Sequence, residues 1–311
     1  MFSCESKPGI LSTILIPPTH IHCLFFGMIQ TIGLAIAFSP TAERMLAETD
    51  HLVKRFSARL VLVHVGERGR AQEQHIDELL LSRGIAKESV TIRWEQGEGA
   101  KAILKACDAE KVDLLVAGAL KKEDLIHYYL GTIARDIMRR AKCSVLLLTQ
   151  PSLDPLGFSN VVINAEDSPS VNTSLRMGIN FCKKESGTWV HVVRELKMYG
   201  LAMSSSDQCS EEEYESTRQQ LVRDEIEKVE KMLLSIPHEQ VKVNIKVVAG
   251  KSGFELAQFA KRKEADLLVV GAPPRRFKLL DRVFTHDLEY VFADLPSNLL
   301  IVQPGKEKAN A

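Results

Sequence analysis

The sequence shows no excess of charge of either sign. Its 311 residues include 40 Lys and Arg and 40 Asp and Glu, so the formal net charge is zero. Proteins that bind nucleic acid through bulk electrostatics carry a surplus of basic residues, so this balance argues against that class of protein. Apolar residues make up 45% of the chain, which is ordinary for a globular protein. The length allows two domains, each with its own core.

Paired cysteines are also missing. The sequence has no CxxC pair, and none of its cysteines has a histidine at metal-ligand spacing. The six cysteines are Cys4, Cys23, Cys107, Cys143, Cys182 and Cys209. This scatter indicates free thiols in a reducing compartment. We therefore expect a cytoplasmic protein without a metal site.

The sequence lacks the phosphate-binding loops of two kinds of ATP-using enzyme. It contains no GxxxxGK[ST] segment, so a P-loop is excluded. Phe38-Ser39-Pro40 follows the first predicted strand, where an ATP pyrophosphatase has an SGGxDS-type loop. His286-Asp287 has no nucleophile at a recognised spacing, and no general base is visible near Gly131. The sequence therefore predicts a protein that is not an enzyme, with a slow ATPase as the alternative.

No apolar run is long enough for a comfortable membrane span. The main candidate, residues 23–38, is interrupted by Gln30 and Thr31, and Ala35-Ile36-Ala37 within it resembles a signal-peptidase site. On this local pattern, a secretory signal or a short membrane anchor is one interpretation. The repeat described next favours a different interpretation, in which residues 31–38 form a strand of the first domain.

The sequence does contain an internal repeat. The segment DLLVAGA that begins at Asp113 returns as DLLVVGA at Asp266, with an offset of 153 residues. Further matches pair 32–46 with 161–175 and 60–65 with 188–193. The last match places His64 opposite His191. A repeat this long indicates two domains rather than a solenoid.

The repeat decides how the first residues are interpreted. Residues 31–38 match a strand of the second half, so cleavage after Ala37 would remove an edge of the first core. We therefore expect neither a cleaved signal nor a membrane anchor. Residues 1–30 are interpreted as a leader, either disordered or the product of a start codon placed upstream of Met28.

Each half alternates short apolar strands with helical patterns, in the order β-α-β-α-β-α-β-α-β. The predicted strands of the first half lie near 31–38, 59–65, 89–94, 112–118 and 143–149. Short, nearly continuous apolar strands between helices indicate an α/β fold, in which helices cover both faces of a parallel sheet. We place a first domain at 31–149, a linker with two prolines and a glycine at 150–157, a second domain at 158–304 and a tail at 305–311.

Local signals predict several helix boundaries. Ser39-Pro40 and Ser168-Pro169 each follow the first strand of a half, with serine suited to the N-cap and proline to the first helical turn. Ser210 and Glu213 form a capping-box pattern at the start of a long charged helix. The preceding residues 195–209 have no periodicity and are expected to form a loop.

The loop AGALKKEDLIHYYLGT, between the fourth strand and the next helix, is the main candidate for a ligand site. Gly118 ends the strand and Gly131-Thr132 opens the helix, where backbone N–H groups and the helix dipole favour an anion. Lys121 and Lys122 add positive charge. A second interpretation stays open, in which Gly131 is a turn glycine, Thr132 is an N-cap and both lysines are solvated.

With these residues the chain resembles a tandem universal stress protein, over about 31–149 and 158–303. The family's nucleotide motif is glycine, two residues, glycine, nine residues, glycine, and then serine or threonine. Gly118, Gly131 and Thr132 fit the first, third and hydroxyl positions, whereas Lys121 replaces the second glycine. The resemblance implies two tandem open five-stranded parallel-sheet domains of the adenine-nucleotide α-hydrolase-like type, with strand order 3-2-1-4-5. It also implies ATP or another adenine nucleotide at the ends of strands one and four, with these four residues as its contacts.

The resemblance has consequences for the second domain. There, Pro274 and Phe284 replace two of the motif's glycines, so we expect this degenerate domain to be closed to nucleotide. The family's aspartate beside the ribose or adenine is Ala37 in the first domain and Glu166 in the second. The final strands of the two domains, CSVLLL and PSNLLIV, are expected to pair antiparallel within the chain and to make a pseudo-two-fold sandwich.

These features predict a stress-response protein that acts as a regulatory or ligand-sensing module, with weak ATP binding in the first domain. A protein-interaction scaffold with two inactive sites is the alternative among binding proteins. We expect a protein partner of unknown identity, and neither nucleic acid nor membrane as a partner. We expect the two domains to pair within one chain as a pseudo-dimer, and the sequence leaves open whether several chains form a higher oligomer.

Overall fold

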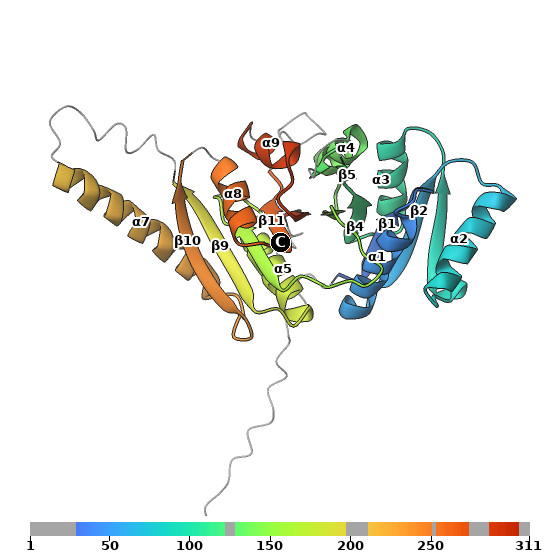
Figure 1. The fold of residues 1–311 in the computed structure, drawn as a ribbon, viewed down its shortest axis with the longest axis horizontal. Helices are drawn as coiled ribbons and strands as arrows, with labels where there is room; N and C mark the ends of the chain where they lie inside the picture. Colours follow the sequence, from blue (N-terminus) through green and yellow to red (C-terminus); the bar gives the residue numbers. More distant parts are fainter. Residues whose placement is uncertain (1–28, 122–127, 197–210, 251–252, 274–285, 305–311) are drawn as a thin grey trace, which may run out of the picture.

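The computed structural model describes residues 29–121, 128–196, 211–250, 253–273 and 286–304. These residues form one ten-stranded sheet with helices on both faces, and a small two-stranded hairpin (Figure 1). No helix in this part of the chain is long and apolar enough to cross a membrane. Residues 1–28 of the predicted leader and the tail from 305 lie outside the described residues, as do Ser210, Pro274 and Phe284. The leader boundary at residue 30 is wrong by two residues, because Ile29 is 3% exposed in the core and the Gln30 N–H donates to Asp113.

The first half contains β1 to β7 and α1 to α4. Its elements are β1 (Thr31–Ala35), α1 (Ala42–Phe56), β2 (Arg59–Val65), α2 (Arg70–Ser82), a short 3₁₀ turn (Lys87–Ser89), β3 (Val90–Glu95), α3 (Gly99–Ala109), β4 (Leu114–Gly118), β5 (Leu120–Lys121), β6 (Tyr128–Tyr129), α4 (Thr132–Arg140) and β7 (Ser144–Leu148). The five main strands lie where the apolar runs predict them. The hairpin of β5 and β6 was not predicted.

The second half repeats this order of elements. They are β8 (Asn160–Asn164), α5 (Val171–Lys184), β9 (Trp189–Leu196), α7 (Glu211–Leu233), β10 (Lys242–Ala249), α8 (Phe254–Arg262), β11 (Leu267–Gly271), α9 (His286–Ala293) and β12 (Asn298–Val302). Because β9 continues to Leu196, the predicted loop at 195–209 is wrong at its first two residues. The rest of that loop lies outside the described residues.

The strand order is β10-β9-β8-β11-β12-β7-β4-β1-β2-β3, so each half has the predicted order 3-2-1-4-5. The two halves meet at β7 and β12, which pair antiparallel with Leu300 opposite Leu146. The predicted antiparallel pairing is therefore confirmed. The two halves therefore form the predicted pseudo-dimer within one chain. Because the pairing is edge to edge, the halves share one continuous sheet and do not stack face to face as a sandwich.

Two layers of helices bury the faces of this sheet. Side chains of α1, α2, α5 and α7 pack on one face, and those of α3, α4, α8 and α9 pack on the other. Each apolar layer contains residues of both halves. Phe158, the first residue after the linker, is 3% exposed, and its ring centre lies 5.7 Å from that of Phe181, which lies 4.9 Å from that of Phe56 in the first half. Residues around the linker therefore belong to the core between the halves.

The repeated aspartates have a definite structural role. The Asp113 carboxylate accepts hydrogen bonds from the backbone N–H groups of Gln30 and Thr31, at 2.9 and 3.0 Å. Asp266 does the same for Ser159 and Asn160, at 2.9 and 2.8 Å, and also accepts from the Ser159 hydroxyl. Each aspartate thus fixes the amino end of the first strand of its half.

Replacing Asp266 with alanine is expected to lower the free energy of unfolding by about 2 kcal/mol, since hydrogen bonds to a charged acceptor contribute about 1.5–3 kcal/mol. Urea unfolding measures this change. Asp266→Asn keeps an acceptor oxygen without the charge, so its loss should be smaller. Equal losses in both variants would contradict this account of the repeat.

The helices that follow the two serine-proline turns begin later in the chain than predicted. The Ser39 and Ser168 carbonyls accept the N–H groups of Ala42 and Val171, at 3.0 and 3.1 Å, and each helix starts only after this turn. The residues before α1 and α5 are Thr41 and Ser170, and neither makes a side-chain cap hydrogen bond. The prediction of serine as N-cap is therefore wrong by two residues, because the proline lies in the tight turn itself.

Strand register also corrects the pairing of the histidines. Leu34 lies opposite Leu62 in the first half, and the corresponding Ile163 lies opposite Val192 in the second. His64 lies two residues after Leu62 in β2, and Arg194 lies two residues after Val192 in β9. His64 therefore corresponds to Arg194, not to His191. The shared letters of VHV had suggested the wrong alignment.

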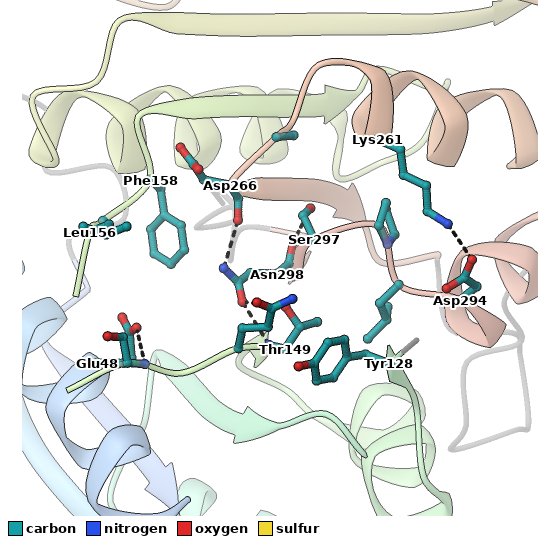
Figure 2. Close-up of a pocket in the computed structure, with 16 residues that line it drawn as sticks. Glu48, Tyr128, Thr149, Leu156, Phe158, Lys261, Asp266, Asp294, Ser297 and Asn298 are labelled. Atoms are coloured by element: carbon teal, nitrogen blue, oxygen red, sulfur yellow. Dashed lines mark hydrogen bonds and ion pairs between the residues drawn. The ribbon is translucent and has the colours of Figure 1, made fainter. Parts of the chain in front are cut away.

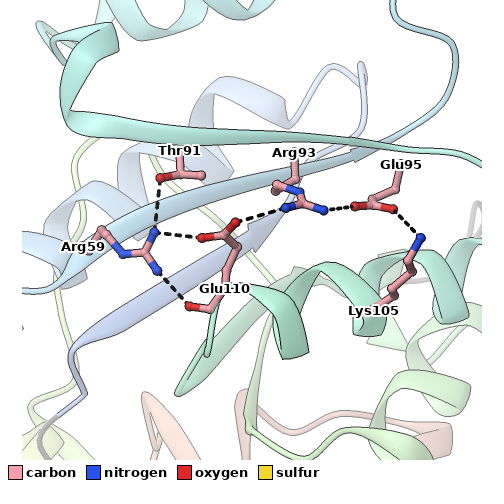
Figure 3. A network of polar contacts seen from close by, with 6 residues as sticks. All are labelled: Arg59, Thr91, Arg93, Glu95, Lys105 and Glu110. Atoms are coloured by element: carbon pink, nitrogen blue, oxygen red, sulfur yellow. Dashed lines mark hydrogen bonds and ion pairs between the residues drawn. The ribbon is translucent and has the colours of Figure 1, made fainter.

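An ion-pair network covers the β3 edge of the sheet (Figure 3). Glu110 binds Arg59 at 3.0 Å and Arg93 at 3.2 Å, and Arg93 binds Glu95 at 2.8 Å. Lys105 lies 3.9 Å from the second oxygen of Glu95. Charged side chains along an edge strand discourage pairing with another sheet. The hydrogen bond from Arg59, and the further contact with Arg93, hold the pKa of Glu110 below its usual value.

A carboxylate with a lowered pKa stabilises the fold above its unfolded pKa, about 4.3 for glutamate, and this contribution is lost as pH falls through the folded value. At pH 7, Glu110→Gln is therefore expected to cost about 1 kcal/mol, a modest value because the partners are partly exposed. The difference from wild type should shrink as the pH falls below about 4. Urea unfolding at both pH values measures it, and a difference independent of pH would contradict the prediction.

Candidate functional site

The predicted site residues lie at the carboxyl ends of the central strands of the first half. Gly118 is the last residue of β4, which pairs with β1, and it is exposed. In open α/β sheets, ligands bind beyond these strand ends. Lys121 lies in β5, where its backbone pairs with Tyr128. Gly131 is the N-cap residue of α4, and Thr132 is its first helical residue.

The hairpin of β5 and β6 brings the start of α4 back to the end of β4. Leu120 lies two residues after Gly118, and a Cβ atom at Gly131 would lie 2.5 Å from Leu120 Cδ1. The Gly131 backbone is extended, with φ of −69°. Glycine is therefore favoured here by the close approach of Leu120, and not by a left-handed turn.

The amino end of α4 can bind an anion. The first N–H groups of a helix have no partner within the helix, and Gly131 provides no side-chain cap. Thr132 and Ile133 are exposed on this first turn. Leu120 and Ile133, which are 50% and 54% exposed, add apolar surface beside these donors. The arrangement offers N–H groups and a hydroxyl to a phosphate, next to an apolar border.

An aromatic cluster lies at the carboxyl ends of β1, β2 and β3, at the same edge of the sheet. Phe38 stacks on His64 with ring centres 4.3 Å apart, and His75 and Trp94 make edge contacts with this pair. The Nδ1–H of buried His64 donates to the Ile36 carbonyl at 3.1 Å. His64 is thus held by the backbone, as expected of a structural histidine. The sequence does not indicate this cluster, because its members come from four separate segments.

The second half carries different side chains at the same strand ends. Arg194, whose side chain is 5% exposed, donates to the Ala165 carbonyl, to Asp167 at 2.6 Å and to Glu225 of α7. Ala165 corresponds to Ile36, so Arg194 replaces His64 as the donor to this carbonyl. Its guanidinium also ties α7 to the strand ends.

Serine hydroxyls surround the glycine that corresponds to Gly118. A Cβ atom at Gly271 would lie 2.5 Å from the Ser170 hydroxyl oxygen and within 3.2 Å of those of Ser168 and Ser174. At Gly118, the nearest atom to such a Cβ is the Met45 sulfur, at 3.6 Å. The end of β11 is therefore more crowded than the end of β4.

Comparison with known proteins identifies the family. The model of the universal stress protein family matches residues 66–149 and 157–303. The chain belongs to the universal stress protein family. A curated universal stress protein of Thermus aquaticus, encoded in the 3′ region of a QAH/OAS sulfhydrylase gene, is 29% identical over 139 residues, which is 39% of this chain and 99% of that protein.

Solved structures of tandem length share the fold. A universal stress protein of Pseudomonas aeruginosa is similar over 89% of this chain and 94% of its own, with a TM-score of 0.61 and 14% identity. One from Archaeoglobus fulgidus is similar over 88% of this chain and 98% of its own, with a TM-score of 0.60 and 14% identity. The family and the tandem α/β fold that the sequence predicted are thus both confirmed.

Proposed function

We propose that this universal stress protein is a stress-response regulatory or ligand-sensing module that binds an adenine nucleotide weakly, in its first half only. The observation that carries the proposal is the difference between equivalent strand ends. Gly118 is exposed and has room for a Cβ atom, since the nearest atom would be the Met45 sulfur at 3.6 Å, whereas Gly271 lies among three serine hydroxyls. Likewise, His64 is replaced by Arg194, which is bound to Asp167 and Glu225.

In this proposal, the phosphates lie at the amino end of α4. The N–H groups after Gly131 and the Thr132 hydroxyl donate to them, and the helix dipole favours their charge. Phe38, which is 38% exposed after β1, offers an aromatic face for the base. Binding is weak because Ala37 supplies no carboxylate for the ribose or base, and because the Cβ of Lys121 stands where the family's second glycine lets the backbone approach the ligand.

A titration with labelled ATP, followed by an assay for phosphate release, distinguishes this proposal from two other functions, a scaffold and a slow ATPase. A sensing module binds ATP without turnover, which is the result we expect. A scaffold with two inactive sites shows no binding at millimolar ATP. Binding with steady phosphate release instead identifies a slow ATPase, and would overturn the proposal that the protein is not an enzyme.

A further inference from the structure

A groove of about 630 Å³ lies where the two halves meet (Figure 2), and none of the four predicted nucleotide-binding residues lines it. Both halves line it, with Glu48 of α1 and Tyr128 of β6 from the first and Asp294, which follows α9, from the second. Asn298 joins the halves in its wall, since its side chain accepts from the Thr149 N–H at 2.9 Å and donates to the Asp266 carbonyl at 2.9 Å. A groove of this size is in the range that binds small molecules.

The charge of the lining is negative. Three carboxylates, those of Glu48, Asp266 and Asp294, face one ammonium, that of Lys261, so two negative charges are in excess. Lys261 binds Asp294 at 2.5 Å. Asp266 directs its carboxylate to the start of β8, as described above. In Figure 2, Glu48 and the Asp294–Lys261 pair lie at opposite ends of the groove.

Glu48 is the carboxylate best placed to receive a cation. It is half-buried, and its Oε1 accepts the Ser152 N–H at 3.0 Å. Burial raises the pKa of Glu48, against the lowering effect of Ser152 and of nearby His51. A partly desolvated carboxylate gains more from a bound ammonium than one in water does.

A second carboxylate lies behind the same end of the groove. The Glu185 side chain is 2% exposed, and its Oε2 binds His51 at 2.7 Å and Arg55 at 3.4 Å. Its Oε1 is buried and has no hydrogen-bond partner among the residues that the structure describes. Gly157, which lines the groove, lies directly against it, since a Cβ atom there would be 2.5 Å from Glu185 Oε2. Arg55 balances the charge of Glu185, so the negative charge at this end of the groove is that of Glu48.

Apolar side chains lie between the charged ends. Phe158 and Leu156 come from the linker side and Tyr128 from β6, and Figure 2 shows Phe158 near Glu48 and Tyr128 toward the Asp294 end. Methylene groups pack well on such surfaces, whereas a phosphate would be repelled by the excess of carboxylates. We propose that this groove binds an alkyl diamine, with one ammonium on Glu48, the other near Asp294, and the methylene chain along the apolar side chains.

Calorimetric titration of the full chain with putrescine at low ionic strength tests the proposal. We expect one site per chain, and no heat from butanediol, which has the same carbon chain without charge. A charge-assisted contact contributes about 1.5–3 kcal/mol, so Glu48→Gln should weaken binding roughly ten- to hundredfold. Glu78→Gln on exposed α2 changes the net charge equally and should bind like wild type.

A second variant keeps the test independent of effects on folding. Leu156 is 95% exposed, so Leu156→Arg places a cation at the groove without disturbing the core, and it should abolish putrescine binding. The proposal is overturned if wild type binds no putrescine, if butanediol binds equally well, or if both groove variants bind like the Glu78→Gln control. None of the four residues predicted to bind ATP lines the groove, so these titrations test the diamine site separately from ATP binding.

Discussion

Replacing Gly131 with phenylalanine should abolish ATP binding while changing the free energy of unfolding by less than about 1 kcal/mol. The phenyl ring would cover the amino end of α4, where the N–H donors for phosphate lie. The first atom that it meets is Leu120 Cδ1, at the far end of a half-exposed side chain that can turn away. The extended backbone at Gly131 is open to any residue. The second half has Phe284 at the matching sequence position.

The matched control is Leu81→Phe, which adds an aromatic ring at a 79% exposed position near the C-terminal end of α2, beyond the contact of His75 with Phe38. It should bind ATP like wild type. Calorimetric titration of the three proteins, with urea unfolding of each, separates lost binding from lost structure. If wild type binds ATP and Gly131→Phe binds it equally well, the loop is only a connection between β4 and α4.

Replacing Arg194 with alanine should lower the free energy of unfolding by about 3–5 kcal/mol, which is typical when one partner of a buried ion pair is removed. The change leaves Glu225, 16% exposed, with only its contact to Lys228 among the described ion pairs. It also removes the donor to the buried Ala165 carbonyl. Asp167 is 74% exposed and returns to water at little cost. The loss therefore comes mainly from Glu225 and the carbonyl.

Two further variants identify this cause. Arg194→Lys keeps the charge, but one ammonium cannot reproduce the planar set of donors, so we expect an intermediate loss. Adding Glu225→Gln to Arg194→Ala removes the uncompensated charge and should restore part of the stability. Urea unfolding measures all three proteins. A loss below about 1 kcal/mol in Arg194→Ala would mean that the ion pairs do not hold α7 to the sheet.

The fold could be predicted from the sequence because its strands are short apolar runs in a long repeat. Asp113 and Asp266 recur because each satisfies the amino end of a first strand, so the repeat reflects a physical requirement. The alignment of His64 with His191 failed because shared letters do not encode strand register. The hydrogen-bond register between neighbouring strands aligns His64 with Arg194 instead, and this register is known only from the structure.

The candidate site was predicted only in part. The glycines of the loop gave its position, since they mark a strand end and a helix start. The β5–β6 hairpin consists of two residue pairs, too short to leave a periodic pattern, so the contact of Leu120 with Gly131 could not be foreseen. The groove between the halves has no sequence signal either, because its residues converge from the linker and from elements that are distant in the chain.

A crystal structure of the protein with a non-hydrolysable ATP analogue tests the central claim most directly. We predict density for one nucleotide per chain, with its phosphates at the amino end of α4 and its base beyond β1 of the first half. The ends of β8 and β11 should hold Arg194 and the serine hydroxyls as they are, without nucleotide. A nucleotide in the second half, or a first half that stays empty at saturating analogue, would contradict the account.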